Sequence, residues 1–134
     1  MDETLSNLID YLKQHVAGLQ GVYLFGSFAQ GLAMPGSDID LAVLSDQSLD
    51  MLTRLEYQDQ LAVIAGREVD LVNIREINLI FQHEIVATGQ RIFTADEAAC
   101  VDFEVDMLMM YIDFNMARQA ILNDIYERGY VRGK

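Results

Sequence analysis

The sequence has very little cysteine and proline and no tryptophan, and these shortages narrow what the chain can be. Its single cysteine, Cys100, cannot form an internal disulfide, which is typical of a protein from a reducing cytoplasm. The start of the chain is acidic, and charged residues interrupt its apolar pattern, so it does not resemble a secretory signal. We therefore expect a cytoplasmic protein.

Long apolar runs and basic residues are also scarce. No apolar run reaches the roughly 18 residues of a membrane helix, so no membrane span is expected.

Lys and Arg number 9 against 21 Asp and Glu, which gives a formal net charge of −12. Stable nucleic-acid binders neutralise phosphates with Lys and Arg, so we expect no stable nucleic-acid binding. The acidic balance favours a small-molecule substrate that arrives with Mg²⁺ or a basic protein partner, although solubility alone would also explain it.

The apolar residues, 51% of 134, suffice for the core of one domain. Their spacing predicts helices and strands in alternation. The expected helices span residues 4–17, 48–65 and about 77–88, and the expected strands span residues 21–25, 38–44, 68–74 and 91–93. Thr94-Ala-Asp-Glu97 is typical of a capping box that opens a long helix to about residue 127. This order predicts an α/β (α+β) fold, in which helices flank a small mixed sheet.

Acidic residues interrupt two of the predicted strands. Asp38 and Asp40 are two residues apart, so in a strand they would project from the same face. Asp70 interrupts a second strand, where its apolar neighbours would face the opposite way. Such close like charges raise each other's pKa unless a cation neutralises them. If the two strands are neighbours, the carboxylates converge on a site for Mg²⁺, which prefers carboxylate, water and phosphate oxygens.

A turn at Gly26-Ser27 precedes the acidic pair by ten residues. The pattern Gly26-Ser27, ten residues, Asp38-Ile39-Asp40, followed later by Val69-Asp70-Leu71-Val72, resembles the signature of the DNA polymerase β-like nucleotidyltransferase superfamily. The resemblance covers roughly residues 20–94. It implies a single nucleotidyltransferase domain over residues 1–134, with a catalytic core at about 20–94 and a C-terminal helix at about 95–127.

Within that superfamily the short chain looks like the MntA-like minimal nucleotidyltransferase (MNT) antitoxins, the partners of HEPN ribonuclease toxins. Residues 87–93 resemble their closing turn and strand. The resemblance implies transfer of AMP from ATP to a tyrosine hydroxyl of a cognate HEPN toxin, which would neutralise the toxin in a hetero-oligomer. Two alternatives stay open: a small-molecule, antibiotic-type nucleotidyltransferase, and an antitoxin that acts by binding alone.

The resemblance also assigns roles to residues of this chain. Asp38, Asp40 and Asp70 would bind Mg²⁺ and carry catalysis, and Asp70 would help to deprotonate the acceptor hydroxyl. The nucleotide would be bound by Gly26, Ser27 and Ser37. Ser37 has a second reading as an ordinary turn residue.

One position departs from the family pattern. Many relatives have Arg where this chain has Gln30, so one positive charge toward the triphosphate is missing. Arg67 lies three residues before Asp70, but the alternation of side chains along the strand would place it on the face opposite Asp70.

The long C-terminal helix is expected to carry two apolar stripes, whereas a helix of a small domain needs only one. The first stripe is Phe103, Met107, Met110, Phe114 and Ala117, and the second is Val105, Leu108, Ile112 and Met116. The second stripe predicts a binding surface for a partner. Alternatively, both stripes are covered by the chain's own first helix and loops.

Overall fold

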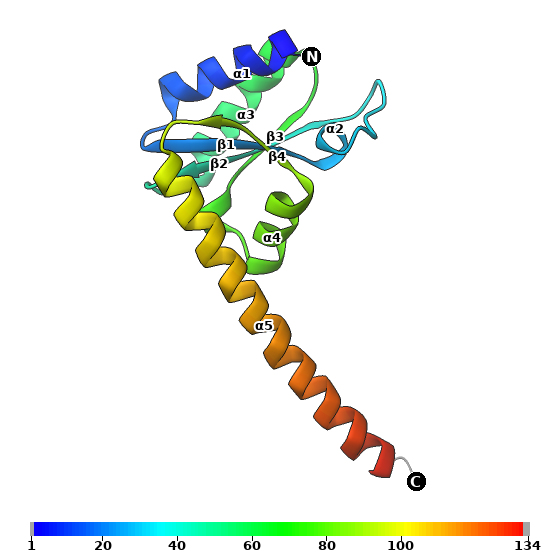
Figure 1. Cartoon of the computed structure of the whole chain (residues 1–134). Helices are drawn as coiled ribbons and strands as arrows, with labels where there is room; N and C mark the ends of the chain where they lie inside the picture. Colours follow the sequence, from blue (N-terminus) through cyan, green and yellow to red (C-terminus); the bar gives the residue numbers. More distant parts are fainter. Residues whose placement is uncertain (1, 133–134) are drawn as a thin grey trace.

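A four-stranded mixed sheet forms the centre of the computed structural model, which describes residues 2–132 (Figure 1). The strand order is β3-β2-β1-β4. Strand β1 (Leu19–Phe25) pairs antiparallel with β2 (Ile39–Ser45) and with β4 (Gln90–Thr94), while β3 (Val69–Asn73) pairs parallel with β2. The predicted fold class is therefore confirmed, and the strands carrying Asp40 and Asp70 are neighbours.

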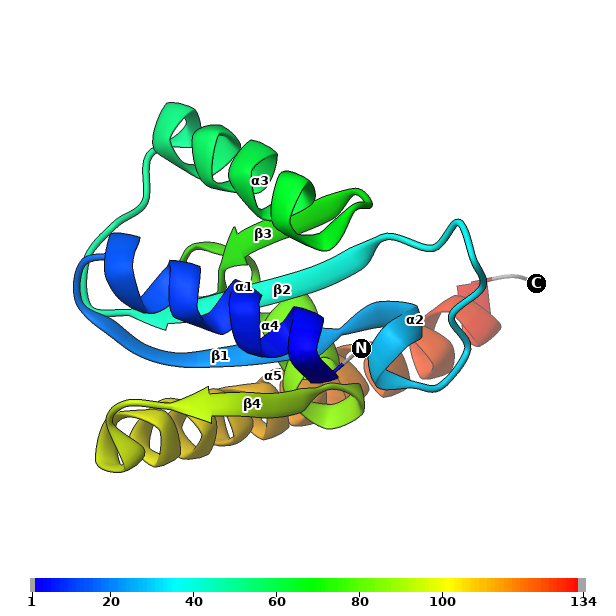
Figure 2. The same cartoon turned by 90° about the horizontal axis from the view of Figure 1, so that it is seen from above.

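Helices cover both faces of this sheet (Figures 1 and 2). Helices α1 (Asp2–His15) and α3 (Met51–Ala65) lie over one face. Helix α4 (Leu79–Thr88) and the beginning of α5 (Glu97–Arg132) lie over the other face. Two short helices complete the order: α2 (Gly26–Ala29) directly after β1, and the 3₁₀ helix η1 (Ile74–Glu76) directly after β3.

The alternation of side chains along β2 divides the core into two clusters. Ile39, Leu41 and Val43 are fully buried in the cluster beneath α1 and α3, whereas Ala42 and Leu44 are fully buried in the cluster on the α4 and α5 side. Because successive side chains of a strand point to opposite faces, Asp40 shares the α4 face with Ala42 and Leu44. This face therefore carries the polar site.

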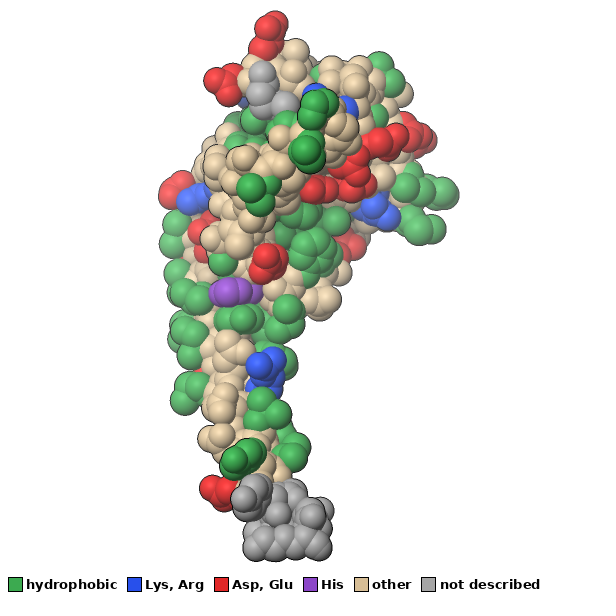
Figure 3. Space-filling model, turned by 90° about the vertical axis from the view of Figure 1, so that its right-hand side faces the viewer, with side chains coloured by type: hydrophobic (Ala, Val, Ile, Leu, Met, Phe, Trp, Pro, Cys, Tyr) green, Lys and Arg blue, Asp and Glu red, His purple; other side chains and the backbone are tan. Residues whose placement is uncertain are grey.

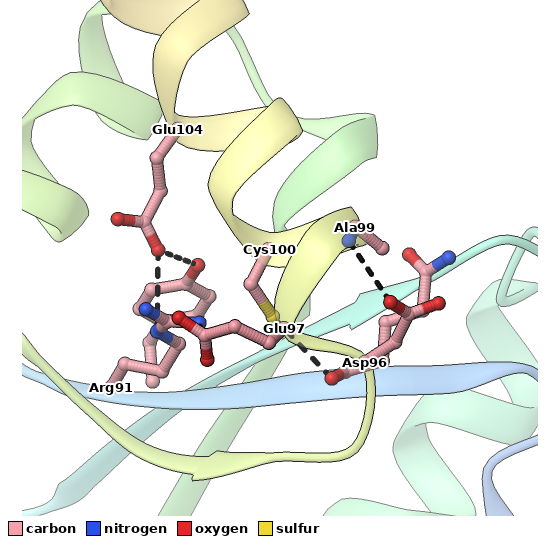
Figure 4. Close-up of polar contacts among 8 residues, drawn as sticks. Arg91, Asp96, Glu97, Ala99, Cys100 and Glu104 are labelled. Carbon is pink, nitrogen blue, oxygen red and sulfur yellow. Dashed lines mark hydrogen bonds and ion pairs between the residues drawn. The ribbon is translucent and has the colours of Figure 1, made fainter.

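The beginning of α5 differs from the expected capping box. Thr94 ends β4, and the Oδ1 atom of Asp96 accepts a hydrogen bond of 3.0 Å from the backbone N–H of Ala99 (Figure 4). Asp96 thus satisfies a free N–H group of the first turn, which is the role predicted for Thr94. The prediction was wrong because strand pairing of β4 with β1 extends through Thr94.

A polar network fastens the first turns of α5 to the sheet (Figure 4). The Tyr23 hydroxyl donates a 2.6 Å hydrogen bond to Glu104, and Arg91 forms ion pairs with Glu104 and Glu97. Burial raises the pKa of Tyr23 far above its ordinary value, and the hydrogen bond to Glu104 adds to the rise. Tyr23 therefore stays protonated and can donate this hydrogen bond throughout the physiological pH range.

Helix α5 projects well beyond the sheet. Its 36 residues make it about 54 Å long at 1.5 Å per residue. Every side chain from residue 112 to residue 128 is exposed, and Figure 3 shows hydrophobic side chains along this projecting part. Within residues 2–132, no helix is both long and apolar enough to cross a membrane.

Candidate active site

Two of the predicted site carboxylates meet across the β2–β3 pair. Asp40 and Asp70 are direct partners in the parallel register of the two strands. Asp40 is half-buried, and Asp70 is exposed between the buried Val69 and Leu71, as the sequence alternation predicts. Asp38 is exposed and lies just before β2, which begins at Ile39.

The environment of Asp40 disfavours a negative charge. Its pKa is raised to about 6, chiefly by burial, then by the charge of Asp70 and a hydrogen bond with it, and finally by the charge of Asp38. A bound cation would relieve the electrostatic cost of placing these two carboxylates side by side. Over the described residues 2–132, however, no three Asp, Glu, His or Cys side chains are arranged to hold a metal ion.

The turn after β1 approaches these carboxylates closely. Gly26 has a φ of +71°, and a Cβ atom there would overlap the carboxylate of Asp40. Only glycine therefore fits both the backbone conformation and the space. Ser27 follows in the half-buried first turn of α2. Its predicted role in nucleotide binding stays a prediction.

Ser37 stabilises a turn, which is the second of the two roles that the sequence allowed for it. Its hydroxyl oxygen accepts a 2.8 Å hydrogen bond from the backbone N–H of Met34. Its carbonyl oxygen accepts a 3.2 Å hydrogen bond from Arg67, whose guanidinium also lies 5.1 Å from the ring centre of Phe28. Since Phe28 packs against the α1 and α3 cluster, Arg67 lies on the face opposite Asp70, as its position in the sequence predicts. Nucleotide binding by Ser37 also stays a prediction.

A pocket of about 280 Å³ opens beside the carboxylate pair. Its walls come from β1, β2, β3, α3 and α4, and its lining residues are Phe25, Asp40, Arg54, Gln58, Asp70, Leu71, Val72 and Phe81. Sequence reasoning missed the contributions of Arg54, Gln58 and both phenylalanines. The one available signal was the spacing of Arg54 and Gln58, which puts a cation and an amide on one face of the helix before the Asp70 strand.

The donor set of this site suits a hard divalent cation. Carboxylate oxygens from adjacent strands, together with waters and phosphate oxygens, are the ligands that Mg²⁺ prefers. Because Gly26 has no side chain, its backbone lies directly beside the Asp40 carboxylate, which is where the phosphate groups of a metal-bound nucleotide would approach. The arrangement can therefore hold a metal-bound phosphate ester beside an open pocket.

Comparison with known families decides the class of protein. Residues 6–98 match the family described as "Polymerase beta, Nucleotidyltransferase". The chain belongs to this family. The resemblance and the nucleotidyltransferase activity that the sequence predicts are thereby confirmed.

The relatives of this nucleotidyltransferase include protein adenylyltransferases. This chain is 33% identical over 120 residues to the protein adenylyltransferase MntA of Shewanella oneidensis. The match covers 90% of this chain and 86% of the relative. A solved structure described as a toxin–antitoxin with AMP-PNP superposes with a TM-score of 0.79 at 33% identity, over 90% of this chain and 96% of the other.

A second solved structure is described as a tri-AMPylated Shewanella oneidensis HEPN toxin in complex with MNT antitoxin. It matches this nucleotidyltransferase with a TM-score of 0.76 at 30% identity, over 92% of this chain and 97% of the other. Spectinomycin 9-adenylyltransferase of Staphylococcus aureus is 36% identical over 72 residues, but this match covers 52% of the chain and 28% of the relative. The likeness to the antitoxins thus extends over nearly the whole chain, whereas the likeness to the antibiotic-modifying enzyme is confined to about half of it.

Proposed function

We propose that this nucleotidyltransferase is a Mg²⁺-dependent protein adenylyltransferase antitoxin. It transfers AMP from ATP to a tyrosine hydroxyl of a cognate HEPN ribonuclease toxin in the cytoplasm and so neutralises the toxin. The observation that carries the proposal is the Asp40–Asp70 pair beside the Gly26 turn, in a chain that matches MntA along 90% of its length. MgATP would supply a cation for the carboxylate pair and phosphate groups for the Gly26 turn.

Asp38, Asp40 and Asp70 are the residues that would hold Mg²⁺. When bound, Mg²⁺ would offset the repulsion between the carboxylates and stabilise the charge that develops on the phosphate oxygens. Asp40 and Asp70 are already paired by the strand register. Asp38 is exposed and lies just before β2, and its charge contributes to the raised pKa of Asp40, which supports a place for its carboxylate beside the other two.

The remaining roles are those that the family resemblance implies, and the positions of Gly26 and Asp70 in the fold support two of them. Gly26 lets the backbone approach the triphosphate, and Ser27 and Ser37 donate hydrogen bonds to its phosphate oxygens. Asp70 faces the open pocket and accepts the proton of the acceptor hydroxyl. Tyrosine has an ordinary pKa of about 10, so at neutral pH its hydroxyl needs such a base.

The exposed apolar surface of α5 supplies a place for the toxin. All four residues of the second stripe, Val105, Leu108, Ile112 and Met116, are between 46% and 67% exposed. In the first stripe, Phe103 and Met107 are buried but Met110 and Phe114 are exposed. The chain's own helices therefore cover only the beginning of the first stripe. A continuous apolar surface of this kind is typical of a protein-binding site.

The two alternatives have less support. The likeness to an antibiotic-type enzyme is partial, because the match to spectinomycin 9-adenylyltransferase spans only 28% of that protein. An antitoxin that acted by binding alone would not need the electrostatically costly Asp40–Asp70 pair, which the fold nevertheless retains.

The proposal is tested by separating binding from chemistry. A HEPN-type toxin from the same genome is incubated with the chain, Mg²⁺ and ATP labelled at the α-phosphate, and complex formation is measured in parallel by pull-down. We expect the wild type to bind and label the toxin, and the double variant Asp38→Asn/Asp40→Asn to bind without labelling it. Labelling at the wild-type rate by the double variant would refute the metal-dependent mechanism.

A further inference from the structure

The pocket beside the carboxylates contains a cation that the mechanism above does not use. Arg54 of α3 is half-buried and reaches around the edge of β3, where its Nη1 atom donates to the carbonyl oxygen of Leu71 at 3.3 Å. Among the described residues, Arg54 forms no ion pair with a carboxylate. Of the described residues that line the pocket together with Asp40 and Asp70, Arg54 is the one basic residue.

A second residue of α3 holds Arg54 in place. The side-chain oxygen of Gln58 accepts a 3.1 Å hydrogen bond from Arg54 and a 2.8 Å hydrogen bond from the backbone N–H of Leu71. Gln58 therefore ties the guanidinium to the edge strand next to Asp70. Its role is that of a positioning residue, because it acts through Arg54.

The opposite wall of the pocket is aromatic. Phe25 at the end of β1 and Phe81 in the first turns of α4 lie edge to face, with ring centres 5.7 Å apart and planes at 82°. Both rings are half-buried, so each keeps a surface open to the pocket. The pocket volume of about 280 Å³ lies just below the range of about 300–1,000 Å³ that is usual for whole small-molecule ligands. This space suits one ring better than an entire nucleotide.

We propose that Phe25, Phe81 and Arg54 form the acceptor subsite, which takes a single phenol side chain. The phenol ring lies against the two phenylalanine rings, and its hydroxyl lies between Asp70 and Arg54. This inference rests on the proposed function, because it explains why the acceptor is a tyrosine. A serine or threonine side chain would leave the aromatic wall without a contact.

The subsite gives each group a part in the transfer. The acceptor O–H gives its proton to the Asp70 carboxylate while the phenol oxygen forms a bond to the α-phosphorus of ATP. The bond from the α-phosphorus to the bridging oxygen breaks, and pyrophosphate leaves with the electron pair. Arg54 stabilises the negative charge that develops on the phenol oxygen before the new bond is complete. It thereby supplies a positive charge at the acceptor end of the site.

Single-turnover transfer within a preformed toxin complex tests the subsite, because toxin docking then does not limit the rate. We expect Phe81→Ala to slow transfer about threefold to tenfold, as the loss of one aromatic contact predicts. Arg54→Met should slow it about tenfold or more, Arg54→Lys less, and the affinity for MgATP should stay within about twofold because neither residue contacts the phosphates. Lys13→Met is the matched control, since it removes one positive charge from α1 and should leave the rate unchanged.

Phe81→Leu keeps apolar volume in the core if Phe81→Ala proves unstable, and thermal unfolding is recorded for every variant. Stable Arg54→Met and Phe81→Leu variants that transfer AMP at the wild-type rate would overturn the subsite.

A binding experiment separates this inference from the proposed function. The chain with Mg²⁺ and a non-hydrolysable ATP analogue is titrated with p-cresol, the side-chain analogue of tyrosine, and followed by NMR, with toluene as the control without a hydroxyl. We expect p-cresol to perturb the signals of Leu71 and Phe81 more strongly than toluene does, and Phe81→Leu to weaken this binding. If the wild type fails to label the toxin but binds p-cresol in this way, the proposed function fails and the phenol subsite stands. No perturbation of pocket residues by p-cresol would overturn the subsite itself.

Discussion

Replacing Asp40 by asparagine should stabilise the metal-free protein, but only at pH values above about 4. The folded-state pKa of Asp40 is about 6, against an ordinary value of 3.8. Between these two values the folded chain binds more protons than the unfolded chain, so the free energy of unfolding falls as the pH rises. Above pH 6 the charged Asp40 destabilises the folded state by the full amount. Below pH 4 this destabilisation disappears, because the carboxyl is protonated in both the folded and the unfolded state.

The size of this effect follows from the shift. About two pKa units correspond to nearly 3 kcal/mol, and partial solvent exposure reduces this to about 1–2 kcal/mol. Asparagine has the same shape, carries no charge and can still donate a hydrogen bond to Asp70. We therefore expect Asp40→Asn to raise the Tm by about 3–8 °C at pH 7.5, from the usual scaling for a domain of this size, and to leave the Tm at pH 4 unchanged.

The assay is thermal unfolding with excess chelator at pH 4, 5, 6 and 7.5. The difference between wild type and variant isolates Asp40 from all other titrating groups. Ser45→Ala, at the far end of β2, serves as a control for substitutions in this strand and should shift the Tm equally at every pH. A loss of stability at pH 7.5 in Asp40→Asn, or a Tm difference that does not change with pH, would refute the electrostatic reasoning about this pair.

The other predictions concern the nucleotide, the partner and the fold. Calorimetry should show that ATP binds more tightly with Mg²⁺ than in excess chelator, and equal affinities would contradict the metal-bridged geometry. Gly26→Ala should abolish AMP transfer, because the added Cβ would meet the carboxylate at the site, and normal activity would show that the close approach is unimportant. Leu108→Gln/Ile112→Gln should weaken the toxin complex in a pull-down while MgATP affinity stays unchanged, and an intact complex would mean that this stripe is not the interface. Tyr23→Phe should destabilise the fold by about 1–3 kcal/mol in urea unfolding, because it removes the 2.6 Å hydrogen bond to the part-buried carboxylate of Glu104 and leaves that carboxylate with Arg91 alone; an unchanged unfolding midpoint would contradict this role of the hydrogen bond.

Local signals in the sequence were sufficient to predict the strands of the sheet and the face on which Asp70 lies. The two-residue alternation predicted that Asp70 would face away from its buried neighbours, and the structure confirms this. The sequence could not state that β2 and β3 pair in the register that puts Asp40 beside Asp70. That register depends on packing of both strands against α3, which is information carried by residues far apart in the chain.

The pocket beside the site was not predictable for the same reason. Phe25, Arg54 and Phe81 come from three different elements, and each alone is an ordinary strand or helix residue. The second apolar stripe of α5 was visible in the sequence, but only the fold shows that the other helices, within residues 2–132, leave all four of its residues exposed. Surfaces left open by the fold are a property of tertiary arrangement, which periodicity cannot report.

The most direct test of the central claim is the mass of the toxin after incubation with this chain and MgATP. We predict that intact-mass spectrometry shows addition of whole AMP groups, that peptide mapping places them on tyrosine, and that the Asp38→Asn/Asp40→Asn variant adds none while still binding the toxin. A toxin that binds the wild-type chain and is neutralised by it, yet gains no AMP, would contradict the account.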